Sequence, residues 1–201
     1  MKTFISFNNK RFGIIFVLTL FAIITATSCR LNILRFDTVP HRSIKLTSLF
    51  IDESSFPPNI EISELPPSDI CKAAPLGSGC KSVEAMGATF YFPVGLAAED
   101  IYRYASVEAA TEDFSRLRED EFEGLTHTKW SKPTELSFIS STASHYYVDC
   151  TTDRSVEICS MLAQYSEFVI HFRAQMVDLN YYDFNNLIQS VDAKVNSVLA
   201  E

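Results

Sequence analysis

The sequence predicts an α+β fold, in which an antiparallel sheet of about five strands carries two packed helices and follows an N-terminal signal or anchor segment. Three observations lead to this prediction. An apolar run near the N-terminus ends in a Cys, several later segments alternate apolar and polar residues as strands do, and the C-terminal segment has an apolar stripe at helical spacing. The length of 201 residues fits one domain with a tether.

Residues 1–29 have the organisation of a secretory signal peptide or a membrane anchor. Three basic residues (Lys2, Lys10 and Arg11) precede an uncharged run from position 12 to position 29, which ends in Ala-Thr-Ser-Cys. This ending resembles the lipobox of bacterial lipoproteins, with Ala26 where Leu is usual. The resemblance implies that the chain is cleaved before Cys29 and that Cys29 carries the lipid.

Two other interpretations of this segment stay open. As an uncleaved helix, its 18 uncharged residues reach about 27 Å, just enough to cross a hydrocarbon core of about 30 Å. Simple secretion after cleavage is the other. Each interpretation places the body outside the cytoplasm, so we expect a membrane-anchored protein on the extracytoplasmic face, in contact with the membrane through its N-terminal lipid or helix.

Residues 30–82 are expected to form a tether and an irregular lead-in. The pairs Pro57-Pro58 and Pro66-Pro67 favour extended backbone, and proline cannot sit in a central strand. Regular structure is expected to begin near Val83, so the globular α+β domain is predicted to span 83–201.

Strand patterns occur at 88–93, 100–106, 135–140, 145–150, 158–165 and 168–174. The segments from 145 onward read as a hairpin followed by a third arm. Taken together, these patterns give an antiparallel sheet of about five strands, in a two-layer or sandwich arrangement.

One helix is predicted within the sheet sequence and one at the C-terminus. Ser106 can cap the first, whose apolar residues recur at helical spacing: Val107, Ala110, Phe114 and Leu117. The acidic run 119–123 opposes the helix dipole, so we expect fraying there before Gly124. The second is expected to begin near Asn180, which together with Asp183 resembles a capping box with Asp in the place of Glu. Its stripe is expected to pack on the sheet face that presents Phe168, Ile170 and Phe172.

The order of these elements resembles the PsbP/Mog1-like domains found in some bacterial lipoproteins. The resemblance concerns element order and therefore the fold. It assigns no functional residue.

Four cysteines remain after Cys29, and they form two pairs with eight residues inside each pair. We predict local disulfides Cys71–Cys80 and Cys150–Cys159, as suits an oxidising compartment, although four cysteines allow three connectivities. Zinc sites place Cys pairs two to four residues apart and redox motifs are CxxC, so neither pattern fits.

The body of the chain is acidic. From Leu46 to the C-terminus there are 10 Lys and Arg residues against 24 Asp and Glu residues. Because nucleic-acid binding depends on phosphate neutralisation by basic residues, we exclude nucleic acid as a partner.

No catalytic or cofactor motif is present, and no cofactor or metal is expected. None of the four His residues belongs to a metal-binding motif, and His171 is expected at the surface or at a sheet edge. The candidate site residues are aromatic. Tyr and Trp combine an apolar ring with a polar group and can therefore bind a ligand or a partner. The possible ligand-facing aromatics are Trp130, Tyr146 and Tyr147.

The function predicted from these features is that of a membrane-anchored extracytoplasmic domain that binds a ligand or an envelope protein partner. An alternative is a structural or accessory envelope lipoprotein without a ligand. An enzyme is the third interpretation, and we expect the protein not to be one.

Overall fold

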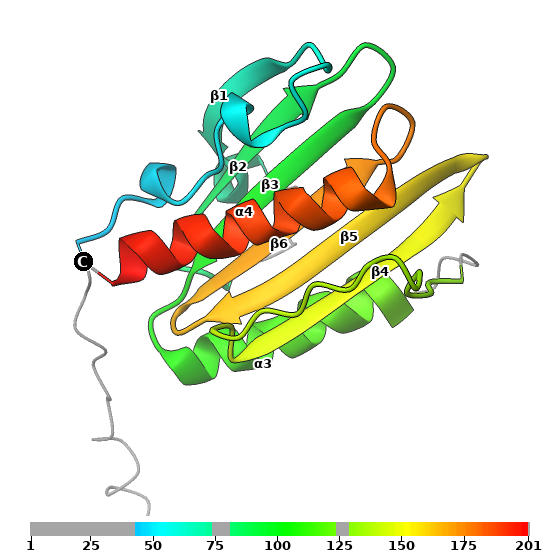
Figure 1. The fold of residues 1–201 in the computed structure, drawn as a ribbon. Coiled ribbons are helices and arrows are strands. Elements are labelled where there is room, and N and C mark those ends of the chain that lie inside the picture. The colour runs from blue at the N-terminus through cyan, green and yellow to red at the C-terminus, as the bar shows by residue number, and fades with distance from the viewer. Residues whose placement is uncertain (1–42, 74–80, 124–128, 201) are drawn as a thin grey trace, which may run out of the picture. The chain divides into compact units, whose positions relative to one another are not determined.

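A six-stranded antiparallel sheet in the order β1-β2-β3-β6-β5-β4 forms the centre of the structure (Figure 1). The computed structural model describes residues 43–73, 81–123 and 129–200. The strands are β1 (Ser63–Asp69), β2 (Glu84–Tyr91), β3 (Leu96–Arg103), β4 (His145–Asp153), β5 (Val156–Tyr165) and β6 (Phe168–Gln175). The helices are α2 (Ile70–Ala73), α3 (Val107–Arg118) and α4 (Tyr181–Leu199), with short turns η1 (Leu46–Ser48), η2 (Glu53–Ser55) and η3 (Glu119–Glu123).

Helix α4 lies along one face of the sheet and confirms the predicted C-terminal helix. Asn180 and Asp183 form the expected capping box. Five residues of the α4 stripe are fully buried in one core with the β6 residues of that face: Phe184, Leu187, Ile188, Val191 and Val195. Val198 and Leu199 are partly buried against it, and the rings of Phe172 and Phe184 lie 5.9 Å apart. Burial of this stripe stabilises a helix that is marginal by itself in water.

Helix α3 lies on the opposite face, where Val169 of β6 joins a second core with Phe114. The predicted cap is present, because the Ser106 hydroxyl accepts a hydrogen bond from Ala109 N–H at 3.2 Å. The two helices therefore sit on opposite faces of the sheet, which makes three layers where two were expected (Figure 1). The acidic run 119–123 forms a π turn, η3, with Phe122 buried, and not a frayed end.

The expected irregular lead-in is part of the folded domain, which is a correction to the predicted boundary at 83. Five apolar residues of the segment are at most 5% exposed: Leu46, Leu49, Phe50, Ile51 and Phe56. Strand β1 accommodates Pro66 and Pro67 because it is an edge strand, and its register with β2 shifts between Leu65 and Ser68. It raises the number of strands to six.

The predicted strand 135–140 is a second correction. This segment is an extended loop outside the sheet, in which Leu136 is buried and Phe138 N–H donates to Asn185 Oδ1 at 3.0 Å. Its apolar alternation therefore reflects packing against α4. The Asn185 side chain accepts the backbone hydrogen bond that a neighbouring strand would accept in a sheet.

The Cys150–Cys159 disulfide is confirmed. The two residues are direct partners in the β4–β5 ladder, and their Cα atoms lie 4.0 Å apart. Cys71 is disulfide-bonded, but Cys80 lies outside the described residues, so the pairing Cys71–Cys80 stays a prediction. Cys29 and the whole segment 1–29 also lie outside them. Among the helices described, none is long and apolar enough to cross a membrane.

Candidate functional site

A cluster of polar side chains lies on the α3 face of the sheet, at its centre. Asp100 of β3 and His171 of β6 are direct partners in the antiparallel register, and so are Ser160 of β5 and Arg173 of β6. Neighbouring strands therefore place all four side chains on one face. Glu121 of η3 joins the cluster through its contact with His171.

The cluster is held by short polar contacts. Ser160 Oγ lies 2.8 Å from His171 Nε2, and Glu121 Oε1 lies 3.6 Å from the same nitrogen. Arg173 donates to Asp100 Oδ2 at 3.4 Å. Ser160 is fully buried and His171 is 6% exposed, which corrects the expectation that His171 is a surface or edge residue. The expectation was wrong because α3 and η3 cover this part of the sheet.

The two carboxyl groups of the cluster have pKa values shifted in opposite directions. Burial raises the pKa of Asp100, and the charges of Arg173 and His171 only partly oppose this effect. Burial also acts to raise the pKa of Glu121, but hydrogen bonding and charge interaction with His171, helped by Arg173, outweigh it and lower the pKa overall. Groups with perturbed pKa values that gather beside a cavity are candidates for a functional site.

The Ser160, His171 and Glu121 side chains do not have the geometry of a nucleophilic triad. In such a triad the hydroxyl and the acid contact opposite nitrogens of the imidazole, whereas here both approach Nε2. The complete burial of Ser160 also removes its hydroxyl from a substrate. The geometry is that of a polar platform that positions Arg173.

A pocket of about 280 Å³ adjoins Arg173 at the end of the sheet away from the start of α3. Its walls are largely apolar, and Arg173 is the only charged residue among the described residues that line it: Leu96, Ala98, Ile158, Arg173, Ala174 and Gln175. The Arg173 side chain is 42% exposed, so its guanidinium group is open to solvent on the pocket side. Small-molecule sites combine mostly apolar walls with a few polar groups in this way.

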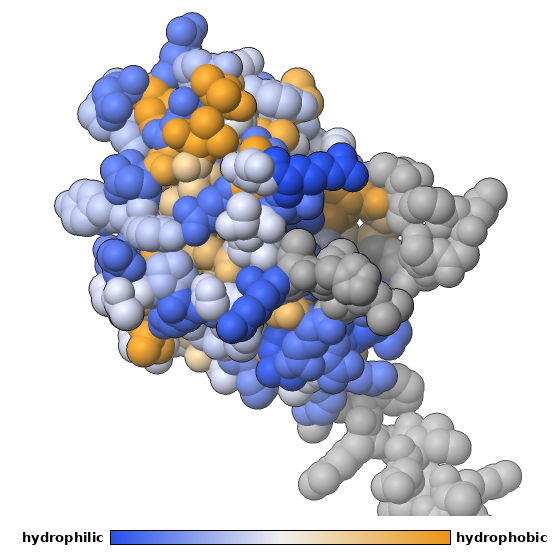
Figure 2. Space-filling view, turned by 90° about the vertical axis from the view of Figure 1, so that its right-hand side faces the viewer, coloured by the Kyte–Doolittle hydropathy of each residue, from blue (hydrophilic) through white to orange (hydrophobic). Residues whose placement is uncertain are grey.

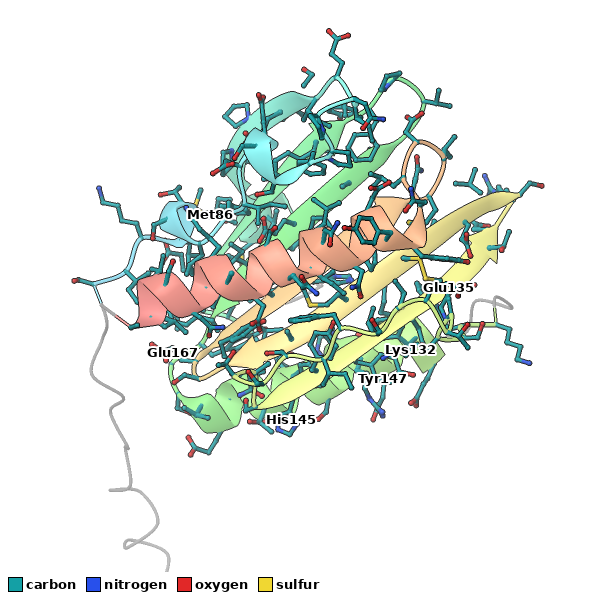
Figure 3. The ribbon with its side chains drawn as sticks, viewed as in Figure 1. Met86, Lys132, Glu135, His145, Tyr147 and Glu167 are labelled. Carbon is teal, nitrogen blue, oxygen red and sulfur yellow. A yellow bond between two sulfur atoms is a disulfide. The ribbon has the colours of Figure 1, made fainter. Side chains whose placement is uncertain are left out.

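The predicted aromatic residues fall on two faces of the sheet. Trp130 and Tyr147 both contact Phe122, at ring-centroid distances of 4.8 and 4.6 Å. Tyr147, labelled in Figure 3, also donates to Asp149. Tyr146 packs on the opposite face, 5.9 Å from the ring of Phe138. The structure thus joins Trp130 and Tyr147 in one cluster and separates Tyr146 from it; contact of any of them with a ligand stays a prediction.

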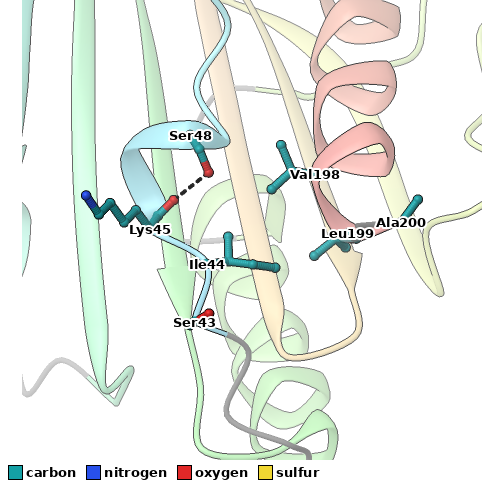
Figure 4. Close-up of a pocket in the computed structure, with 7 residues that line it drawn as sticks. All are labelled: Ser43, Ile44, Lys45, Ser48, Val198, Leu199 and Ala200. Carbon is teal, nitrogen blue, oxygen red and sulfur yellow. Dashed lines mark hydrogen bonds between the residues drawn. The ribbon is translucent and has the colours of Figure 1, made fainter.

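A larger hollow, of about 800 Å³, lies where the end of α4 meets the segment from Ser43 to Ser48 (Figure 4). Among the described residues that line it, Lys45 is the only charged one, and its carbonyl accepts a hydrogen bond from the Ser48 hydroxyl. The chain passes from this hollow directly into residues outside the described ranges. The polar cluster beside Arg173 is the better-defined candidate site because its groups are fixed on central strands.

Sequence reasoning missed the residues of the polar cluster. The available signal was the occurrence of polar side chains inside strands whose neighbours are almost all apolar, as at Ser160 and His171. The pattern indicates a buried polar cluster only when it is known that α3 and η3 cover this face of the sheet.

Neither protein-family models nor curated protein sequences match this chain. Among solved structures, the extracellular domain of PknH from Mycobacterium tuberculosis is similar, with a TM-score of 0.48 and 10% sequence identity. The match covers 77% of this chain and 95% of that chain. A likeness at this level carries no inference about function.

Proposed function

We propose that the protein is an exported domain, tethered to the outer face of a membrane by its N-terminal segment, that binds a small amphipathic ligand in the pocket beside Arg173. Export is supported by the Cys150–Cys159 disulfide, because such bonds persist in oxidising compartments. The signal-like segment ending at Cys29 supports the tether.

The observation that carries the binding proposal is the polar cluster at the edge of an apolar pocket, which is buried at Ser160 and His171 and half-buried at Asp100 and Arg173. Burying polar groups in a sheet lowers the stability of the fold unless the groups are hydrogen-bonded or ion-paired. Apolar residues in the same space would often give a fold that is equally stable or more stable. Within the described residues, the Arg173 guanidinium is held at the pocket wall by one contact, to Asp100 Oδ2 at 3.4 Å. The remaining donors of Arg173 are then available to a ligand.

The chemistry of the pocket favours a short-chain carboxylate. Arg173 presents planar donors that match a carboxylate, and the walls formed by Leu96, Ala98 and Ile158 accommodate an aliphatic chain. The volume of about 280 Å³ limits the ligand to a small molecule or a single side chain.

The test compares hexanoate with hexanamide, which differ only in the charged group. We expect hexanoate to bind the full-length protein and to shift the NMR signals of residues 96–98, 158–160 and 173–175. Arg173→Gln should weaken hexanoate binding by about tenfold, which corresponds to about 1.4 kcal/mol, and should leave the weaker hexanamide binding unchanged.

The matched control is Arg118→Gln, which removes another partly exposed guanidinium that pairs with Glu123 instead of lining the pocket. Hexanoate binding should be unchanged in this variant. Equal loss in both variants would show that hexanoate responds only to the overall charge, and unchanged binding in Arg173→Gln would contradict the proposal.

A further inference from the structure

A third hollow, separate from the pocket beside Arg173 and from the hollow at the end of α4, lies at the beginning of α4. It has a volume of about 490 Å³ and lies between the first turns of α4 and the extended loop that includes 135–137. Its lining consists of Glu135, Ser137, Asn180, Tyr181, Tyr182 and Asn185. Figure 3 labels Glu135 near this end of the helix.

The walls of this groove are held in place by hydrogen bonds on their outer sides. The Tyr181 hydroxyl donates to Glu157 Oε1 on β5, which fixes the orientation of the ring. Asn185 Oδ1 accepts from Phe138 N–H at 3.0 Å and thereby ties α4 to the loop. The groove therefore has a defined shape without a ligand, which lowers the entropic cost of binding.

Other groups of the groove remain available. The Tyr182 side chain is 73% exposed, the highest value among the large apolar and aromatic residues of the described ranges. The amino group of Asn185 makes no hydrogen bond within the part of the chain that the structure describes, because only its Oδ1 atom is engaged. Glu135 and Ser137 are exposed beside it, and the Glu135 carboxylate accepts from the Thr134 hydroxyl through Oε2, at 3.2 Å, so that Oε1 is the oxygen left to a ligand. The groove thus offers an aromatic face, two amide donors, a hydroxyl and a carboxylate.

The surroundings disfavour an anionic ligand. No basic residue is among the described residues that line the groove, and carboxylates of Glu135, Glu157 and Asp183 lie nearby. The capping box of α4 pairs the N–H groups of Asn180 and Asp183, and the Asp183 carboxylate adds negative charge at this end of the helix. Figure 2, which views the side of the molecule toward which this end of α4 points, shows a mostly hydrophilic surface with hydrophobic residues gathered near the top.

We propose that this groove binds a neutral saccharide. A sugar ring has an apolar C–H face that packs against an aromatic ring, and its hydroxyls require closely spaced donors and acceptors. Tyr182 provides the stacking face, and the Glu135 carboxylate and the Asn185 amino group pair with neighbouring hydroxyls at its edge. The open, polar form of the groove suits a ligand that keeps most of its hydration.

The experiment uses two neutral probes, maltohexaose and the tetramer of N-acetylglucosamine, and the acidic tetragalacturonate. The full-length protein is purified in a detergent without a sugar headgroup, and binding is followed by saturation-transfer NMR and by shifts of the backbone amides. We expect at least one neutral probe to bind with shifts at 135–137 and 180–185, and tetragalacturonate to bind more weakly. Absence of binding by both neutral probes would overturn the proposal.

Two variants locate the site. Tyr182→Ala should weaken the neutral probe by about tenfold. Asn185→Asp keeps the oxygen that accepts from Phe138 N–H but removes the amide donors, so it should weaken binding without loss of fold. Tyr91→Ala removes another exposed tyrosine, 44% exposed at the end of β2, and should have no effect.

The results separate this site from the pocket beside Arg173. Binding that survives Tyr182→Ala, or equal loss in Tyr91→Ala, would overturn the saccharide site. Tighter binding of tetragalacturonate than of either neutral probe would overturn the argument from charge. Because hexanoate binding depends on Arg173 and not on Tyr182, neither result changes the test of the proposed function.

Discussion

Glu99 is the most deeply buried acid of the structure's described part, and it lies on the α4 face of the sheet. Its side chain is completely buried, and Oε2 accepts a hydrogen bond from Ile51 N–H at 3.0 Å. Oε1 has no hydrogen-bond partner among the residues that the structure describes. Burial raises the pKa of Glu99 to about 8, against the favourable effect of the Ile51 hydrogen bond. One carboxyl group thus secures the 49–51 segment to the sheet and makes the fold sensitive to pH.

The first prediction follows from this raised pKa. Between the ordinary value of 4.5 and the folded value of about 8, the folded state holds a proton that the unfolded state has lost. The contribution of Glu99 to stability is therefore full below pH 4.5 and declines as the pH rises toward 8, by about 1.4 kcal/mol per pH unit. Glu99→Gln keeps an acceptor for Ile51 and removes the titration.

The measurement is a set of urea melts of the wild type and Glu99→Gln at about pH 5 and about pH 8. We expect the variant to gain stability relative to the wild type by a few kcal/mol between the two conditions. A constant difference between the two proteins would show that Glu99 has the same pKa in both states.

Gly87 gives a second prediction at the scale of a single residue. A Cβ atom at this position would lie 2.6 Å from Asp100 Oδ1 and 2.8 Å from Ile70 Cγ2, so a side chain does not fit without movement. Gly87→Ala should lower the free energy of unfolding by about 1–3 kcal/mol. At Gly95 the nearest atom is 3.4 Å away, and Gly95→Ala should change stability by less than about 0.5 kcal/mol. Thermal melts of the two variants measure the difference in stability. Equal losses of stability would contradict the steric argument.

At the scale of elements, the sequence predicts most accurately the strands and helices that have one clearly apolar face. The arms β4, β5 and β6 and helix α4 have one clearly apolar face, and all four were predicted, as was the disulfide that joins β4 to β5. The failures share a physical cause. β1, with its two prolines, and the loop 135–140 take their conformation from partners far away in sequence, β2 and Asn185.

The candidate site was predicted less well than the fold, for a related reason. His171 and Arg173 alternate with apolar residues, as a solvent-facing strand side would, and only the position of α3 and η3 shows that His171 is covered. Trp130 and Tyr147 were selected for their chemistry, and their meeting around Phe122 depends on a π turn that the sequence pattern does not reveal.

Helix α4 carries the third prediction. Leu187 is fully buried at the centre of the stripe, so Leu187→Ala should cost about 2–5 kcal/mol. Gln189 is exposed on the same helix, and Gln189→Ala should change stability by less than about 0.5 kcal/mol. Asn185 is unsuitable as a neutral control, because its side chain bonds to Phe138 N–H. Urea melts with equal, small effects for both variants would mean that α4 is not docked on the sheet in solution.

At the scale of the whole molecule, charge is divided between the ends of the chain. The first 45 residues contain 7 of the 17 basic residues and a single acid, Asp37, whereas the rest is strongly acidic. Acidic protein is repelled from an anionic bilayer surface, and basic segments next to a membrane are attracted to it. This division suits a domain that projects from a membrane on a basic tether.

The last prediction concerns that tether. If the segment ending at Cys29 is cleaved and lipidated, the mature protein begins with a lipid-bearing cysteine, and Cys29→Ala removes the acceptor. We expect the variant to keep the uncleaved N-terminus or to be released or mislocalised, while the domain from Ser43 onward folds unchanged. A lipid adds about 0.8 kcal/mol of membrane affinity for each buried methylene, so loss of the acyl chains should move protein from membrane to soluble fractions.

Intact-mass spectrometry of the membrane form of the wild type, with fractionation of both proteins, provides the measurement. Ser28→Thr, which leaves Cys29 in place, tests whether any change near the cleavage site has the same effect. A wild-type mass that begins at Met1 with a free Cys29 thiol would contradict lipidation and favour the uncleaved helix.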